Sequence, residues 1–172
     1  MIKVWNLETG EYLYDFPEIT NKYHIGCLSL NDELLAAGDY SRRVLVYSVK
    51  DRKLLATFQQ TEMAYDLAFS PDHKYLLASL PNSLIEVYDM ESMQHSKTLK
   101  GHKSSVPYSA LSQDYKYLVS CSNTEVIIWD AKTLDNILTI EEKIYLCSSK
   151  HRLLMGILHD GLYKKFNTKL LH

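Results

Sequence analysis

Short apolar runs of four to six residues alternate with polar turn segments along most of this sequence of 172 residues. In the stretch 101–141 the runs are separated by SQDYK, SNT and AKTLDN. No segment keeps the i, i+3, i+4, i+7 spacing of an amphipathic helix, and the runs are rich in Val, Ile, Tyr, Leu and Thr. The pattern therefore predicts an all-β protein, with strands in this stretch near 106–111, 117–121, 125–130 and 137–140.

A bulky aromatic residue ends a similar apolar run at a regular interval. Trp5, Tyr47, Tyr88 and Trp129 are 42, 41 and 41 residues apart, and Phe166 belongs to a weaker fifth copy. Repeats of about 40–45 residues fit a four-stranded propeller blade and also helical HEAT-type units. Because the composition is that of strands, we expect a β-propeller arc of four-stranded antiparallel blades.

The two kinds of run also suggest where each strand lies in a blade. Runs such as VIIW and YLLA are apolar at every position. This is expected of inner strands, which neighbouring blades cover on both faces. The more mixed EYLYDF and HSKTL suit outer strands, which have one edge in water.

The stretch 101–141 also carries a set of polar residues in a characteristic order. They are Gly101–His102, Asp114 in the first turn, Ser120 in the second strand, and Trp129–Asp130 closing the third. This arrangement resembles the WD-repeat β-propeller family. The resemblance implies a buried hydrogen-bonded chain within one blade, formed by His102, Asp114, Ser120 and Trp129. Such a chain is physically reasonable, because a buried indole N–H needs an acceptor.

The neighbouring units keep the period but lose most of this motif. The unit before has Asp72 in the phrase FSPDHKYLLAS, yet Gln60, Ala78 and Tyr88 stand where the histidine, serine and tryptophan are expected. We therefore expect a single WD-repeat region over residues 1–172. Its expected parts are a partial blade at 1–20, full blades at 21–60, 61–100 and 101–141, and a degenerate last blade at 142–172.

The expected strands are too few for a closed ring of this family, since about four blades leave two apolar flanks uncovered. Two hypotheses follow from this count. In one, the chain is part of a longer propeller that lacks its N-terminal blades. In the other, two copies of the chain self-associate to complete a ring.

His102, Asp114 and Ser120 also have the residue types of a hydrolase triad. A triad needs an exposed hydroxyl beside a base, together with an oxyanion hole. Ser120 lies within YLVSCS rather than in a G-x-S-x-G turn, so a structural network is the favoured interpretation. The seven histidines show no H-E-x-x-H spacing. We expect no catalytic residues, no metal site and no cofactor.

Charge and composition narrow the class of protein further. A formal net charge of -2 disfavours general attraction to nucleic acid. No apolar run approaches the about 20 residues that span a bilayer, and the N-terminus lacks a signal-peptide pattern. Three cysteines without C-x-x-C spacing are expected to be reduced thiols. We expect an intracellular protein, either cytoplasmic or nuclear.

The expected function is that of a non-enzymatic scaffold that docks partner proteins or peptides on its loop face. Tyr65, Asp66 and Tyr108 fall early in first strands, near the loops that join blades, and aromatic residues are favoured at binding hot spots. The alternative for these residues is packing between blades. The alternative function is a ligand-binding sensor or enzyme with a site in the central channel, although the expected first strands offer one acid, Asp66, and no histidine.

Overall fold

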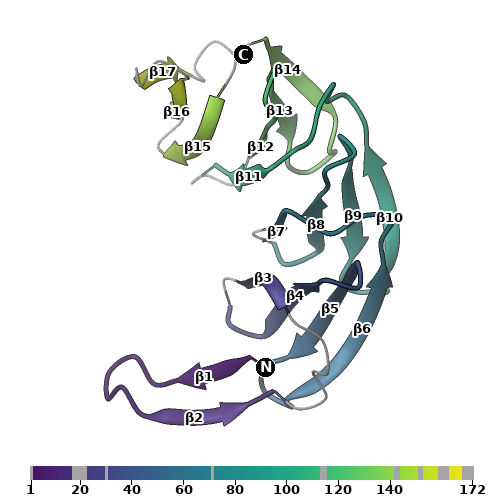
Figure 1. The fold of residues 1–172 in the computed structure, drawn as a ribbon, viewed down its shortest axis with the longest axis vertical. Helices are drawn as coiled ribbons and strands as arrows, with labels where there is room; N and C mark the ends of the chain where they lie inside the picture. The colour runs from purple at the N-terminus through teal and green to yellow at the C-terminus, as the bar shows by residue number, and fades with distance from the viewer. Residues whose placement is uncertain are drawn as a thin grey trace.

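The computed structural model describes residues 2–16, 23–29, 31–70, 72–112, 116–141, 144–150, 153–158 and 163–167, with the backbone alone in the last three ranges. These residues form seventeen strands and no helix. Every strand pairs antiparallel with its neighbours, in five separate sheets that follow one another along the chain. The sheets are arranged as blades of an open arc (Figure 1). The predicted all-β propeller arc is confirmed.

The sheets differ in their number of strands. The first contains β1 (Lys3–Trp5) and β2 (Tyr12–Asp15), and the last contains β15 (Ile144–Lys150), β16 (Leu153–Leu158) and β17 (Tyr163–Asn167). Between them lie three four-stranded sheets in sequential order. They consist of β3 (Tyr23–Leu28), β4 (Leu34–Asp39), β5 (Arg43–Ser48) and β6 (Lys53–Gln59); β7 (Asp66–Phe69), β8 (Tyr75–Ser79), β9 (Ile85–Asp89) and β10 (Gln94–Leu99); and β11 (Tyr108–Leu111), β12 (Tyr117–Cys121), β13 (Val126–Asp130) and β14 (Asn136–Ile140).

The second and third strands of each full sheet carry the core. In β4, β5, β8, β9, β12 and β13 most side chains are buried, whereas β6, β10 and β14 are mostly exposed. The continuous apolar runs therefore belong to strands that are covered on both faces. The first strands β3, β7 and β11 lie on the inner side of the arc, and β6 and β10 lie on its outer side (Figure 1).

The core lies between neighbouring sheets. One apolar cluster joins Val46 of the second sheet to Leu76 and Tyr88 of the third. The next joins Val87 of the third sheet to Trp129 of the fourth. Each buried aliphatic or aromatic side chain contributes about 1.5–3 kcal/mol, so each sheet depends on the next for much of its stability.

The turns from the third to the fourth strand of the full sheets share a residue with positive φ, four positions after the last residue of the third strand. In the last of them, Asp130 Oδ1 accepts hydrogen bonds from the backbone N–H groups of Lys132 and Thr133, both at 2.8 Å. These bonds lower the pKa of Asp130. Leu134 then takes a positive φ of 60°, as do its counterparts Met93 and Arg52. The acid of the Trp129–Asp130 pair therefore organises a turn.

The cysteines differ from the expectation of reduced thiols. Cys121, buried at the end of β12, is disulfide-bonded, so the expectation is wrong for this residue. Cys27 in β3 is a free thiol. Burial, helped by the charge of Asp66, raises its pKa to about 12. The side chain of Cys147 falls outside the described residues.

Within the described ranges, no helix has the length and apolar character needed to cross a bilayer.

Candidate functional site

Three of the four residues in the predicted polar network lie in direct contact. The indole N–H of Trp129 donates to Ser120 Oγ at 2.8 Å, and Ser120 Oγ lies 2.6 Å from His102 Nε2. β12 supplies the serine and β13 the tryptophan. His102 lies in the entry segment, residues 100–107, which precedes the first strand of the sheet. Asp114, the fourth predicted member, lies outside the described residues.

The carboxylate that contacts His102 is Glu125, which the sequence interpretation did not include. Its Oε1 lies 3.0 Å from His102 Nδ1 and accepts hydrogen bonds from Ser122 Oγ at 2.8 Å and from Lys103 N at 2.8 Å. Thr124 donates to its other oxygen. Glu125 stands four residues before Trp129, but nothing in a single sequence marks this glutamate as the partner of a distant histidine.

The protons of this network can be assigned from its charges. Burial alone would raise the pKa of Glu125, but the bonds from Thr124, Lys103, Ser122 and His102 outweigh burial and lower it to about 2. Burial lowers the pKa of His102, despite the opposing effect of Glu125. Glu125 is therefore ionised and His102 neutral, with Nδ1–H donating to Glu125 and Nε2 accepting from the Ser120 hydroxyl.

This chain has the connectivity of a Ser–His–Glu triad but is closed to a substrate. Ser120 has an exposed fraction of 0%, and its oxygen already accepts the indole N–H of Trp129. A nucleophile must be reached by the carbonyl that it attacks. The geometry favours a structural function, which holds β12, β13 and the entry segment together.

The preceding sheet replaces the network with a single direct contact. Tyr88 stands at the position of Trp129, and Ala78 at that of Ser120, so no hydroxyl lies between the aromatic residue and the entry segment. Gln60 Nε2 instead donates to the Tyr88 hydroxyl at 2.9 Å. Leu84 stands at the position of Glu125, and the buried Gln60 Oε1 has no hydrogen-bond partner among the described residues.

The predicted partner-binding residues lie close together on the inner strands. Tyr65 precedes β7 and is 48% exposed, and Tyr108 begins β11 and is 41% exposed. Asp66 of β7 accepts hydrogen bonds from Ser109 of β11, at 2.7 Å from the backbone N–H and 2.9 Å from the hydroxyl. Burial raises the pKa of Asp66, and these bonds from Ser109 oppose it. Asp66 thus joins two sheets, whereas both tyrosines are exposed to solvent.

A family model described as "WD domain, G-beta repeat" matches residues 93–130. The match ends at the Trp129–Asp130 pair and includes His102 and Ser120 of the network. Residues 93–130 therefore match a WD repeat. The predicted resemblance is confirmed.

Relatives and solved structures agree with this assignment. This chain is 28% identical over 100 residues to "WD repeat-containing protein slp1" of Schizosaccharomyces pombe, a match that covers 57% of the chain and 20% of that protein. It is 22% identical over 149 residues to the "Serine-threonine kinase receptor-associated protein" of Gallus gallus, covering 84% of the chain and 41% of that protein. The solved "Structure of U3-55K" shares its fold, with a TM-score of 0.71, 16% identity, and coverage of 86% of this chain and 52% of that one. The chain therefore spans less than half the length of either curated relative.

Proposed function

We propose that this WD-repeat chain is a non-enzymatic platform that docks partner proteins or peptides on the loop face formed near Tyr65 and Tyr108. The observation that carries the proposal is the exposure of these two tyrosines, 48% and 41%, at the starts of neighbouring first strands. Tyrosine offers a large contact area at a low cost in conformational entropy, and it is enriched among hot-spot residues. One relative is named a receptor-associated protein, which is in keeping with a binding role.

Asp66 supports the proposal by setting the spacing of the two tyrosines. It follows Tyr65 in the chain and bonds both donors of Ser109, the residue after Tyr108. A partner that contacts both rings therefore meets a surface whose two halves are already held together. Preorganisation of this kind lowers the entropic cost of binding.

The test is quantitative affinity capture from source cells with the chain as bait, read by mass spectrometry. The bait variant Tyr65→Ala/Tyr108→Ala removes both rings. The matched control is Tyr40→Ala, which removes an exposed tyrosine, at 59%, from the turn between β4 and β5. We expect a set of proteins that is retained by the wild type and the control and lost with the double variant. Retention of the same set by all three baits would overturn the docking face.

A second proposal concerns the β1–β2 hairpin at one end of the arc. Its described side chains include the exposed apolar residues Trp5, Leu7, Tyr12 and Leu13, at 52%, 100%, 47% and 50%. We infer that another sheet covers this hairpin, supplied either by further blades or by a second copy of the chain. Native mass spectrometry of the purified chain distinguishes the two. A dimer supports the second copy, and a monomer that binds little hydrophobic dye contradicts both arrangements.

A further inference from the structure

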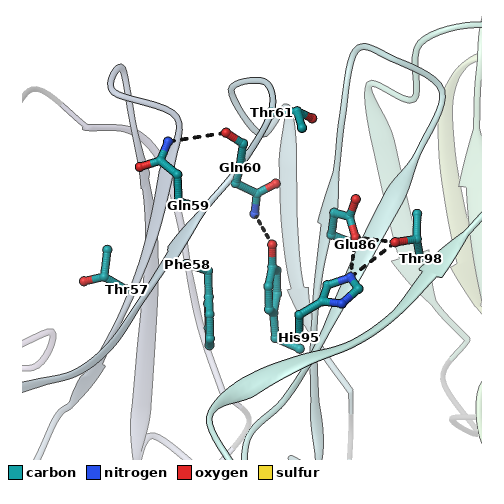
Figure 2. Close-up of a pocket in the computed structure, with 9 residues that line it drawn as sticks. Thr57, Phe58, Gln59, Gln60, Thr61, Glu86, His95 and Thr98 are labelled. Carbon is teal, nitrogen blue, oxygen red and sulfur yellow. Dashed lines mark hydrogen bonds and ion pairs between the residues drawn. The ribbon is translucent and has the colours of Figure 1, made fainter.

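A polar cavity lies between the second and third sheets on the outer side of the arc. Its volume is about 410 Å³, within the range of about 300–1,000 Å³ typical of ligand pockets. Residues 57–61 of β6 and the following loop form one wall, and side chains of β9 and β10 form the other. Figure 2 shows Gln60 on the first wall, with Glu86 and Thr98 across from it.

The cavity owes its acidic character to Glu86. Glu86 pairs with Thr98 of the outer strand. In the adjacent sheets the residue that pairs with the corresponding threonine is apolar: Leu45 in one and Ile127 in the other. Leu45 and Ile127 are buried, with exposed fractions of 5% and 0%. The fold therefore accepts an aliphatic side chain at this position, and the carboxylate is particular to this one blade.

The carboxylate of Glu86 is held in place but keeps acceptor capacity. Its Oε2 lies 2.6 Å from His95 Nε2 and accepts the Thr98 hydroxyl at 2.7 Å. An ionised carboxylate has about four lone-pair sites, so these two contacts do not saturate it. The Glu86 side chain retains an exposed fraction of 16%.

Gln60 provides a second acceptor in the opposite wall. The residue is 7% exposed, and its Oε1 is the atom without a partner among the described residues. A buried amide oxygen left unpaired costs about 1–3 kcal/mol. Phe58 and Tyr88 form an aromatic wall of the cavity, where their rings stack with centroids 4.0 Å apart.

We propose that this cavity binds an arginine side chain of a partner polypeptide. The guanidinium is planar, carries five donors, and both pairs with carboxylates and packs on aromatic rings. The cavity matches these needs with the Glu86 carboxylate, the Gln60 carbonyl and the aromatic wall. None of its nine lining residues is lysine or arginine. Arg42 touches the lining residue Thr61 only at its backbone carbonyl, at 3.0 Å.

The cavity is separate from the loop face around Tyr65 and Tyr108, so the inference does not rest on the proposed docking there. Its test is NMR titration of the isotopically labelled full chain with three probes: N-acetyl-arginine amide, the lysine analogue, and the neutral isostere N-acetyl-citrulline amide. The signals to follow are the Gln60 side-chain amide and the backbone amides of Glu86 and Thr98. We expect saturable shifts with the arginine probe, and binding at least about tenfold weaker with citrulline.

Two cavity variants and one control complete the design. Glu86→Ile installs the residue that the next sheet carries at this position, and Glu86→Gln removes the charge alone. Both should weaken arginine binding by about tenfold or more. Glu91→Gln removes an exposed carboxylate from the β9–β10 turn and should leave binding unchanged. Binding of the lysine analogue as tight as that of the arginine probe would overturn the assignment to arginine. Equal shifts with citrulline, no shifts at all, or unchanged binding in both Glu86 variants would overturn the proposal.

Discussion

Ser120 Oγ accepts the indole N–H of Trp129 at 2.8 Å, and both side chains are buried in the β11–β14 sheet. The same oxygen lies 2.6 Å from His102 Nε2, so one hydroxyl satisfies two rings at once. Removal of this hydroxyl therefore leaves two buried polar groups without a partner, which costs more than the loss of one hydrogen bond between exposed groups.

We expect Ser120→Ala to lower the free energy of unfolding by about 1–3 kcal/mol. Trp129→Ala should lower it by about 3–5 kcal/mol, because it also empties part of the core. Urea unfolding followed by fluorescence and circular dichroism measures both. The control is Ser104→Ala, whose hydroxyl makes only a 3.3 Å contact with Thr124. If Ser120→Ala were no less stable than Ser104→Ala, the network would not be a stabilising element.

The low pKa of Glu125 predicts how stability depends on pH. The folded value of about 2 lies below the ordinary value of 4.5, so the stabilisation from this group is complete above about pH 4.5 and is lost as the pH falls toward 2. The lowered pKa of His102 acts in the same direction, because its protonation is also resisted in the folded state. Unfolding curves across this range should show the wild type losing stability steeply, and Glu125→Gln losing less. Parallel curves for the two proteins would contradict the assignment.

The contact between Asp66 and Ser109 links two sheets, so we predict that its loss lowers the free energy of unfolding. Asp66→Ala removes the acceptor of both bonds, and we expect it to destabilise the chain by about 1–3 kcal/mol. Asp66→Asn should cost less, since it keeps one acceptor oxygen and removes the negative charge that burial disfavours. Hydrogen exchange at the Ser109 amide reports directly on its bond to Asp66, and it should accelerate in Asp66→Ala. Unchanged exchange there would mean that the two strands are held by other contacts.

A fourth prediction concerns the ion pair between Asp39 and Arg43 at the β4–β5 hairpin. Asp39 is fully buried, lies 2.7 Å from Arg43 Nη2, and also accepts from the backbone N–H groups of Ser41 and Arg43. Asp39→Ala should destabilise by about 3 kcal/mol, because it breaks a buried pair and leaves turn donors unpaired. Arg43→Lys should lose less, but not nothing, because lysine cannot reproduce the contacts that both Nε and Nη2 of Arg43 make with Asp39 Oδ2. Thermal unfolding checks both, and a neutral Asp39→Ala would refute the prediction.

Much of the fold could be predicted because its signals are local. The interval between Trp5, Tyr47, Tyr88 and Trp129 indicated repeated blades, and the fully apolar runs indicated strands covered on both faces. Both patterns follow from burial, which acts on every repeat in the same way. The family motif added the contacts among His102, Ser120 and Trp129, since residue order within one blade implies their proximity.

The remaining features depend on which side chains meet across the packed strands and sheets. Glu125 faces His102 from 23 residues away, and Asp66 reaches Ser109 from 43 residues away in the next sheet. The cavity beside Glu86 likewise exists only where β6 packs next to β9 and β10. By itself the sequence determined the number, type and order of the strands, because hydrophobic periodicity is read along the chain. Only the tertiary structure decided the polar partners, because hydrogen bonds and ion pairs require a particular distance and direction between groups that the sequence places far apart.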